Sequence, residues 1–235
     1  MRVDGMNQLQ KKASESYIVG IILAVVGGYL DVYTYVSRGG VFANAQTGNI
    51  VLLAINIARG DMSKAAMYAL PILAFMAGIV VTEFVKTRYR RTHYFHWRQI
   101  VIALEFLVLL VIAFVPSGTH DDLVNIAVSF VCSMQVESFR TFDGNGFATT
   151  MCTGNLRSAT EYLFYSGVDK DRTKRKKSLQ YYGIIAVFIL GAIIGMKLTV
   201  IYREKSVLAG CFLLLVVFVL MFIPMQNDPM KKKME

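Results

Sequence analysis

The sequence predicts an all-α integral membrane protein with six transmembrane helices, arranged as two inverted three-helix repeats that each contain a re-entrant half-helix. Three observations support this fold class. Apolar residues make up 55% of the 235 residues and charged residues only 17%, which is more apolar than soluble domains of this length usually are. The apolar residues gather into runs of membrane length. Both halves of the chain also carry the same polar motif at the same distance from an acidic residue.

Six apolar runs are long enough for spanning helices, which need about 17 to 25 residues. They are expected at residues 17–36, 65–86, 99–116, 123–142, 181–201 and 207–224. Residues 1–16 are polar and are expected to form a cytoplasmic tail, while the first run is long enough to remain as an anchor rather than a cleaved signal. A basic cytoplasmic tail is expected at 225–235. Repeat 1 then covers residues 17–116 and repeat 2 covers residues 117–224.

The internal repeat appears when the chain is compared with itself at the offset that places Asp31 on Glu137. At this offset the run Thr47-Gly48-Asn49 falls on Thr153-Gly154-Asn155 without a gap. A basic insertion at 170–177 separates this match from the next one, in which the helix at 65–86 aligns with the helix at 181–201. Each repeat contains an odd number of spans. The second copy must therefore enter the membrane from the opposite side, as in many secondary transporters.

Each repeat also contains a shorter polar segment, at 40–60 and at 146–165, that either crosses the membrane or dips in and returns. If both segments return, four basic clusters share the cytoplasmic side, as the positive-inside rule favours. Eight full spans would move the cluster between Lys86 and Arg98 to the other side. Arg157 and Glu161 also make a lipid-facing crossing of the second segment costly. We therefore expect six spans and two cytoplasmic termini.

The polar stretch at 44–49 precedes an apolar run of about half a membrane thickness, which predicts a half-helix. Thr47 or Asn49 is expected to cap this helix, and Thr153 or Asn155 is expected to cap its partner. A helix N-terminus is electropositive. Two such ends that approach one midplane from opposite sides would favour an anionic group between them.

Asp31 and Glu137 lie deep in the first and fourth predicted helices, so both are expected to face the bundle interior. Two roles are equally open: bonding the N–H groups of the half-helices, or binding protons or cations during transport. Arg140 is expected to neutralise Glu137 locally, while Glu83 and Glu105 are treated as interface residues. The predicted substrate-binding residues are the two motifs, the preceding glutamine and the two acids: Gln46, Thr47, Gly48, Asn49, Thr153, Gly154, Asn155, Asp31 and Glu137.

Several other functions are not expected. Cys132, Cys152 and Cys211 are isolated and are interpreted as small core residues, so no metal and no cofactor are predicted. The net charge of +9 belongs mostly to loops and termini beside apolar runs and does not indicate nucleic-acid binding. No nucleophile and base stand at a useful spacing, so an enzyme is not expected. Gly191 and Gly195 are typical of a helix-packing face.

The residues that carry a family resemblance are Asp31-Val-Tyr-Thr-Tyr35 and Gly39-Gly-Val-Phe-Ala-Asn-Ala-Gln-Thr-Gly-Asn49, together with the second TGN motif. With these residues the chain resembles the bacterial YoaK-like family, multi-pass membrane proteins with a domain of unknown function. The resemblance covers nearly the whole chain. In the second copy, Cys152 replaces the equivalent of Gln46 and Ala148 that of Phe42. The resemblance implies a bacterial cytoplasmic membrane protein and implies no activity.

The leading functional hypothesis is a small secondary transporter or permease whose solute is held between the two half-helix N-termini. The positive helix ends favour an anionic or carboxylate-bearing solute, whereas the two acids favour coupling to protons or cations. The alternative is a non-transporting membrane scaffold or sensor with a dry, packed centre. The expected partners are the lipid bilayer and a small solute, and a homo-oligomer remains open.

Overall fold

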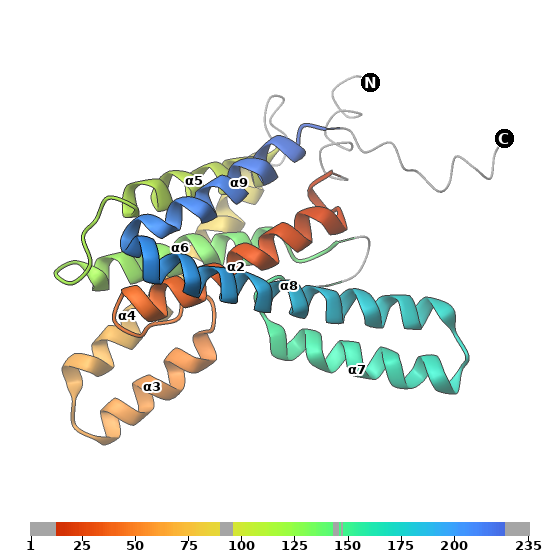
Figure 1. Ribbon diagram of the computed structural model, residues 1–235, viewed down its shortest axis with the longest axis horizontal. Coiled ribbons are helices and arrows are strands. Elements are labelled where there is room, and N and C mark those ends of the chain that lie inside the picture. The colour runs from red at the N-terminus through yellow and green to blue at the C-terminus, as the bar shows by residue number, and fades with distance from the viewer. Residues whose placement is uncertain (1–12, 90–95, 143–145, 147, 224–235) are drawn as a thin grey trace.

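The computed structural model describes residues 13–89, 96–142, 146 and 148–223 (Figure 1). The helices are α2 (Tyr17–Ser37), α3 (Gln46–Ala58), α4 (Met62–Tyr89), α5 (Trp97–Ile112), α6 (Asp121–Ser138), α7 (Cys152–Val168), α8 (Arg172–Tyr202), the 3₁₀ turn η1 (Arg203–Val207) and α9 (Leu208–Leu220). Most of the two predicted tails, residues 1–12 and 225–235, lies outside the described residues.

The six predicted long helices correspond to α2, α4, α5, α6, α8 and α9. The largest difference is in α8, which begins at Arg172 rather than at 181. The side chain of Asp171 accepts the N–H of Thr173 at 2.7 Å and so caps a helix that includes the basic segment. Among the described residues, three stretches are long and apolar enough to cross a membrane: Tyr17–Ser37, Met62–Tyr89, and Arg172–Leu220, which joins α8 to α9.

Two helix crossings depend on glycine. At Gly191 of α8, a side-chain carbon would collide with the carbonyl oxygen of Val25 in α2, and Gly195 continues this contact one turn later. At Gly78 of α4, a side-chain carbon would collide with the carbonyl oxygen of Phe130 in α6. The packing face predicted at Gly191 and Gly195 is confirmed. Helix α8 of the second predicted repeat thus packs on α2 of the first, and α4 of the first packs on α6 of the second.

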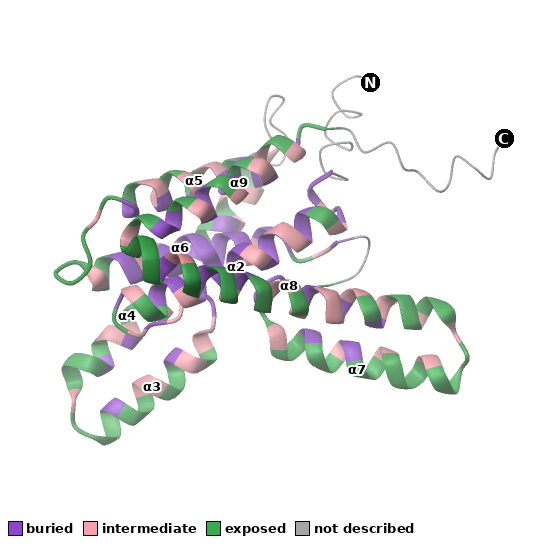
Figure 2. Ribbon diagram, in the orientation of Figure 1, coloured by how far each residue is buried: buried purple, intermediate pink, exposed green. Residues whose placement is uncertain are grey.

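The two central helices, α2 and α6, run antiparallel (Figure 1). Near the end of α2, the carbonyl of Arg38 accepts a hydrogen bond from the side-chain amide of Asn125 at 2.7 Å, close to the start of α6. Near the end of α6, the amide nitrogen of Gln135 lies 3.4 Å from the carbonyl oxygen of Leu23 in α2. These helices carry much of the buried surface, whereas α3 and α7 are mostly exposed (Figure 2).

The two short helices form hairpins with the long helices that follow them. In Figure 1, α3 with α4 and α7 with α8 project from the bundle in different directions. With 13 residues, α3 is about 20 Å long at 1.5 Å per residue. A hydrocarbon core is about 30 Å thick. Helix α3 thus covers about two thirds of the hydrocarbon thickness.

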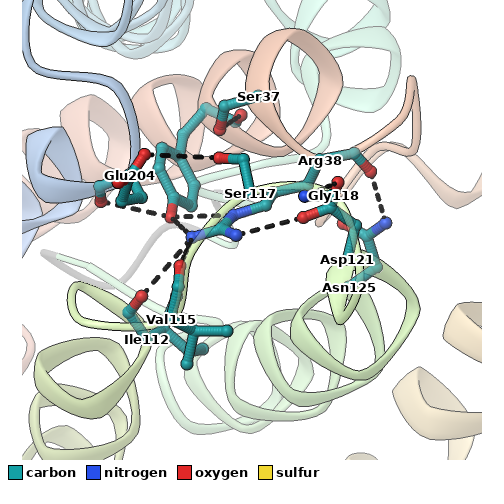
Figure 3. A network of polar contacts seen from close by, with 10 residues as sticks. Ser37, Arg38, Ile112, Val115, Ser117, Gly118, Asp121, Asn125 and Glu204 are labelled. Atoms are coloured by element: carbon teal, nitrogen blue, oxygen red, sulfur yellow. Dashed lines mark hydrogen bonds and ion pairs between the residues drawn. The ribbon is translucent and has the colours of Figure 1, made fainter.

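A buried arginine ties together one end of the bundle (Figure 3). The side chain of Arg38 is fully buried, and its guanidinium group forms an ion pair with Asp121 at 3.0 Å. The same group donates to the hydroxyl oxygen of Tyr33 at 2.8 Å and to the carbonyl oxygen of Val115 at 2.9 Å. Tyr33 in turn donates to the carbonyl oxygen of Glu204 in η1 at 3.3 Å. One guanidinium therefore joins α2, the α5–α6 connection and, through Tyr33, η1.

A second buried arginine has a similar role at the opposite end. Arg98 in α5 donates to the carbonyl oxygen of Ser138 at 2.8 Å and pairs with Glu15 at 3.0 Å. It also donates to the hydroxyl of Ser14 at 2.6 Å, and Ser14 is fully buried. Arg98 therefore ties the last residues of the predicted N-terminal tail to the bundle.

Candidate functional site

Asp31 caps α3 from a neighbouring helix. Its side chain is buried in α2, and its Oδ1 accepts the backbone N–H of Asn44 at 2.6 Å and of Ala45 at 3.3 Å. Ala45 is the N-cap residue of α3, which has no side-chain cap of its own. The prediction that Thr47 or Asn49 caps this helix is wrong, because a carboxylate from α2 accepts N–H groups at its start.

Asn49 and Asn155 make the same pair of hydrogen bonds. Oδ1 of Asn49 accepts the N–H of Phe42 at 3.0 Å, and its Nδ2 donates to the carbonyl of Phe42 at 2.8 Å. Asn155 binds both backbone groups of Ala148 in the same way, at 3.2 and 2.5 Å. Each asparagine therefore fixes the loop before its own helix. The N-cap residue of α7 is Met151 without a side-chain cap, so the caps predicted at Thr153 or Asn155 are also wrong.

The loops that lead to α3 and α7 meet on α2 at Gly27. The Nδ2 of Asn44 lies 3.4 Å from the carbonyl oxygen of Gly27 and donates to it. The methyl group of Thr150 packs so closely against Gly27 that a β-carbon would not fit there. Two buried oxygens, Oδ1 of Asn44 and Oγ1 of Thr149, have no hydrogen-bond partner among the described residues. The starts of the two half-helices thus both contact α2 at Gly27, and each carries one buried oxygen without a partner among the described residues.

The rest of the two motifs lies away from Gly27. Thr47, Thr153 and Gly154 are exposed on the outer sides of α3 and α7. Gln46 is half-buried and donates from its Nε2 to the carbonyl of Ala43 at 2.9 Å. Gly48 is half-buried against the ring of Phe42. The structure therefore brings Asp31 and the two asparagines to the loops but leaves the threonines and Gly154 outside.

Glu137 does not repeat the role of Asp31. Its carboxylate pairs with Arg140 at 3.2 Å, as predicted from their spacing, and its side chain is 13% exposed. A second pair of the same type, Glu83 with Lys86 at 2.7 Å, lies beside it. No hydrogen bond within the described ranges joins Glu137 to Thr150 or Met151. The two acids thus differ in their partners: Glu137 pairs with Arg140, whereas Asp31 accepts backbone N–H groups at the start of α3.

The sequence interpretation missed the burial of Glu105. Helix α5 begins at Trp97, where His96 and Gln99 form a capping box, so Glu105 stands at the middle of the helix rather than near an interface. Its side chain is completely buried. The side-chain amide of Gln135 in α6 lies 2.8 Å from its Oε1. An acid centred in an apolar run is the signal that identifies such a position.

The cysteines are packing residues. Cys132 and Cys211 are buried, and Cys152 is half-buried at the start of α7. Within the described part of the chain, no three His, Cys, Asp or Glu side chains are placed to hold a metal ion. A pocket of about 360 Å³ lies near the α5–α6 connection. Its lining is almost wholly apolar and contains none of the predicted site residues: Ile112, Val115, His120, Leu123, Val124 and Ala127.

Comparison with known proteins places the chain in a family. A protein family described as "Protein of unknown function (DUF1275)" matches residues 19–220. The chain belongs to this family. The DUF1275 match begins in α2 and ends in α9, so it covers both half-helices and nearly all of the helical bundle.

A curated relative agrees with this assignment. The chain is 28% identical over 143 residues to the "UPF0700 transmembrane protein YoaK" of Bacillus subtilis (strain 168). The match covers 60% of this chain and 64% of that relative. No solved structure matches the chain. With its apolar helices, this DUF1275 protein is a transmembrane protein.

Proposed function

We propose that the protein is a small secondary transporter or permease of the bacterial cytoplasmic membrane that carries a small anionic or carboxylate-bearing solute. One observation carries the proposal: the loops before α3 and α7 meet on Gly27 of α2, and each loop holds a buried oxygen, of Asn44 or of Thr149, that has no partner among the described residues. A polar atom inside a membrane protein is costly unless water, protein or a ligand satisfies it. A hydrated solute path past Gly27 would supply hydrogen-bond partners for both oxygens.

The proposed architecture is six spans in two inverted repeats, with both termini in the cytoplasm. The exchanged packing of α2 on α8 and of α6 on α4 supports it, because a two-fold relation between the halves interchanges these pairs. The identical bonds of Asn49 and Asn155 and the antiparallel course of α2 and α6 support it as well. The networks around Arg38 and Arg98 collect helix ends into two separate sets, as alternating spans require.

The preference for an anionic group comes from the start of α7. At α3, the carboxylate of Asp31 already accepts the N–H groups of Asn44 and Ala45. At α7, the equivalent acid is paired with Arg140 instead. A helix N-terminus without an acidic partner attracts negative charge. The hydroxyl of Thr149, buried one turn before α7, is a further donor for a carboxylate.

A membrane scaffold or sensor is the second candidate. The capping role of Asp31 and the loop-fixing role of Asn49 are both structural, and the exposed positions of Thr47 and Thr153 remove two predicted solute ligands. A scaffold would keep the region around Gly27 dry. Hydration of this region therefore separates the two functions.

The test is the accessibility of single cysteines in a background that lacks the three native thiols. Asn44→Cys and Thr149→Cys are treated with a small, water-soluble thiol reagent in membranes. The matched controls are Val200→Cys, on an exposed apolar face of α8, and Thr119→Cys, in the exposed α5–α6 loop. Transport predicts labelling at 44, 149 and 119 but not at 200. Protection at both 44 and 149, with labelling at 119, would support the scaffold.

A further inference from the structure

Glu105 is an acid that the proposed solute path does not use. It lies in the middle of α5, and its side chain is 0% exposed. Helix α5 packs against α4, α6, α9 and η1. The titratable groups near Glu105 are the thiols of Cys132 from α6 and Cys211 from α9, while α4 and η1 contribute none among the described residues.

No positive charge compensates Glu105. Among the described residues, no Lys, Arg or His forms an ion pair with its carboxyl group, and the two buried arginines pair with Asp121 and Glu15 instead. An ionised carboxylate without a partner is expensive to bury in an apolar environment, and such a group is usually neutralised by a proton. The surroundings of Glu105 therefore favour the protonated form.

Gln135 can pair with Glu105 in both protonation states. When its amide nitrogen faces the carboxyl group, it donates to Oε1 at 2.8 Å and to Oε2 at 3.2 Å, which suits an ionised carboxylate. In the opposite orientation, the amide oxygen lies at this short distance from Oε1, and the nitrogen donates to the carbonyl of Leu23 at 3.4 Å. Two oxygens so close require a proton between them. The orientation of Gln135 is thus linked to the proton on Glu105.

We infer that Glu105 and Gln135 form a proton-binding site in the bundle interior, and that this proton exchanges with water. The site lies near the meeting point of the loops, since Gln135 and Asn44 both reach carbonyl oxygens of α2, at Leu23 and Gly27, one turn apart. A role of Glu105 as the proton-coupling group of a transport cycle rests on the proposed function. The binding of a proton by Glu105 does not depend on that function.

Asp31 is the natural comparison. Its carboxylate accepts two backbone N–H groups at the start of α3, and both favour its ionised form. Glu105 accepts at most the amide of Gln135. The two buried acids therefore differ in their partners: two backbone N–H groups favour the ionised form of Asp31, whereas Glu105 has only one amide donor among the described residues.

Infrared difference spectroscopy of the full chain in lipid bilayers tests the site without a known solute. The expected result is a carbonyl band from a protonated carboxyl group at neutral pH that weakens as the pH is raised and shifts in heavy water. Glu105→Gln should abolish this band, whereas Asp31→Asn should leave it in place. Gln135→Met should shift the band without removing it, because the acceptor of the proton is lost.

A band that is insensitive to Glu105→Gln, or no protonated carboxyl band at all, would overturn the inference. A band that depends on Glu105 but responds neither to pH nor to heavy water would overturn the exchange. These results are independent of cysteine labelling at 44 and 149. Protection of those cysteines together with a titrating Glu105 band would refute transport and leave the proton site standing.

Discussion

Single residues show how one side-chain type takes on different roles in this bundle. Asp31, Glu105 and Glu137 are all acids in central helices, and each has a different partner. Asp31 bonds backbone N–H groups, Glu137 pairs with Arg140, and Glu105 faces an amide. Because a carboxyl group takes its charge state from its partners, these three acids are not interchangeable.

Replacing Asp31 should destabilise α3. Asp31→Leu leaves two buried N–H groups unpaired, and each such group costs about 1–3 kcal/mol. Asp31→Asn keeps an acceptor oxygen and should cost clearly less. Thermal unfolding in detergent measures both, with Asp122→Asn on the exposed face of α6 as the control. Equal stability of Asp31→Leu and the wild type would contradict the capping role.

Replacing Arg38 should be more damaging. Arg38→Met leaves Asp121 without its ion pair and the carbonyl of Val115 without a donor, and loss of one partner of a buried ion pair costs about 3–5 kcal/mol. Arg59→Met, at the exposed end of α3, is the matched control and should change stability little. The comparison uses unfolding temperatures in the same detergent. A similar small effect for both variants would show that Arg38 does not hold the helix ends together.

The site residues were only partly predictable, for a physical reason. Sequence spacing identified Asp31 and the two asparagines, because a buried acid and a repeated polar motif are visible along the chain. The caps at Thr47 and Thr153 were wrong because Asp31 reaches α3 from another helix, and a local motif carries no information about such a contact. Glu105 was missed because its burial depends on packing between helices.

At the scale of helices, close packing through glycine fixes the arrangement of the bundle. Gly191 brings α8 onto the backbone of α2, and Gly78 brings α4 onto that of α6. Small residues at such crossings let helices in membranes approach closely, where van der Waals contacts replace the hydrophobic effect as the driving force. These crossings connect the two halves of the chain.

Adding a methyl group at a crossing should push the helices apart. Gly191→Ala and Gly78→Ala each place a carbon against a carbonyl oxygen of the neighbouring helix, and such overpacking costs about 1–3 kcal/mol. Gly154→Ala in α7 is the matched control, since open space surrounds that position. It should be neutral, or stabilising by about 0.5–1 kcal/mol. An equal change in the unfolding temperature for all three variants would contradict close helix packing at Gly191 and Gly78.

The two loop-fixing asparagines should contribute alike. Asn49→Ala and Asn155→Ala each remove two hydrogen bonds to a backbone seven residues earlier and should each cost about 1–3 kcal/mol. Thr47→Ala and Thr153→Ala, on exposed sides, should stay within about 0.5 kcal/mol of the wild type. Hydrogen exchange at the start of α3 and α7 reports the loss locally. Faster exchange in only one of the two loops would contradict an equivalent role of the two asparagines.

The long helices were predictable because apolar runs of membrane length have few other interpretations. The boundaries were less accurate. The predicted helix at 99–116 ends at Ile112, before Pro116, and α8 extends into basic sequence after its cap at Asp171. Hydropathy alone places the start of this helix at 181, where the apolar run begins. The charged residues before it are helical as well, because Lys and Arg are good helix formers and the cap lies at Asp171.

For the whole molecule, the contacts between halves matter more than those within them. Helices α2 and α6 pass each other in opposite directions, and each is covered by a helix of the other half, α2 by α8 and α6 by α4. The networks of Arg38 and Arg98 close the two ends. Repetition in the sequence indicated two related halves, but this exchange of partners required the structure.

The inverted insertion of the two halves is the central claim, and side-specific labelling of two residues tests it directly. Ser63→Cys and Thr173→Cys are conservative changes in the first turns of α4 and α8, where both residues are exposed. In intact cells, a membrane-impermeant maleimide should label position 63, and it should label position 173 only after permeabilisation. Labelling of both cysteines from the same side would contradict the inverted architecture.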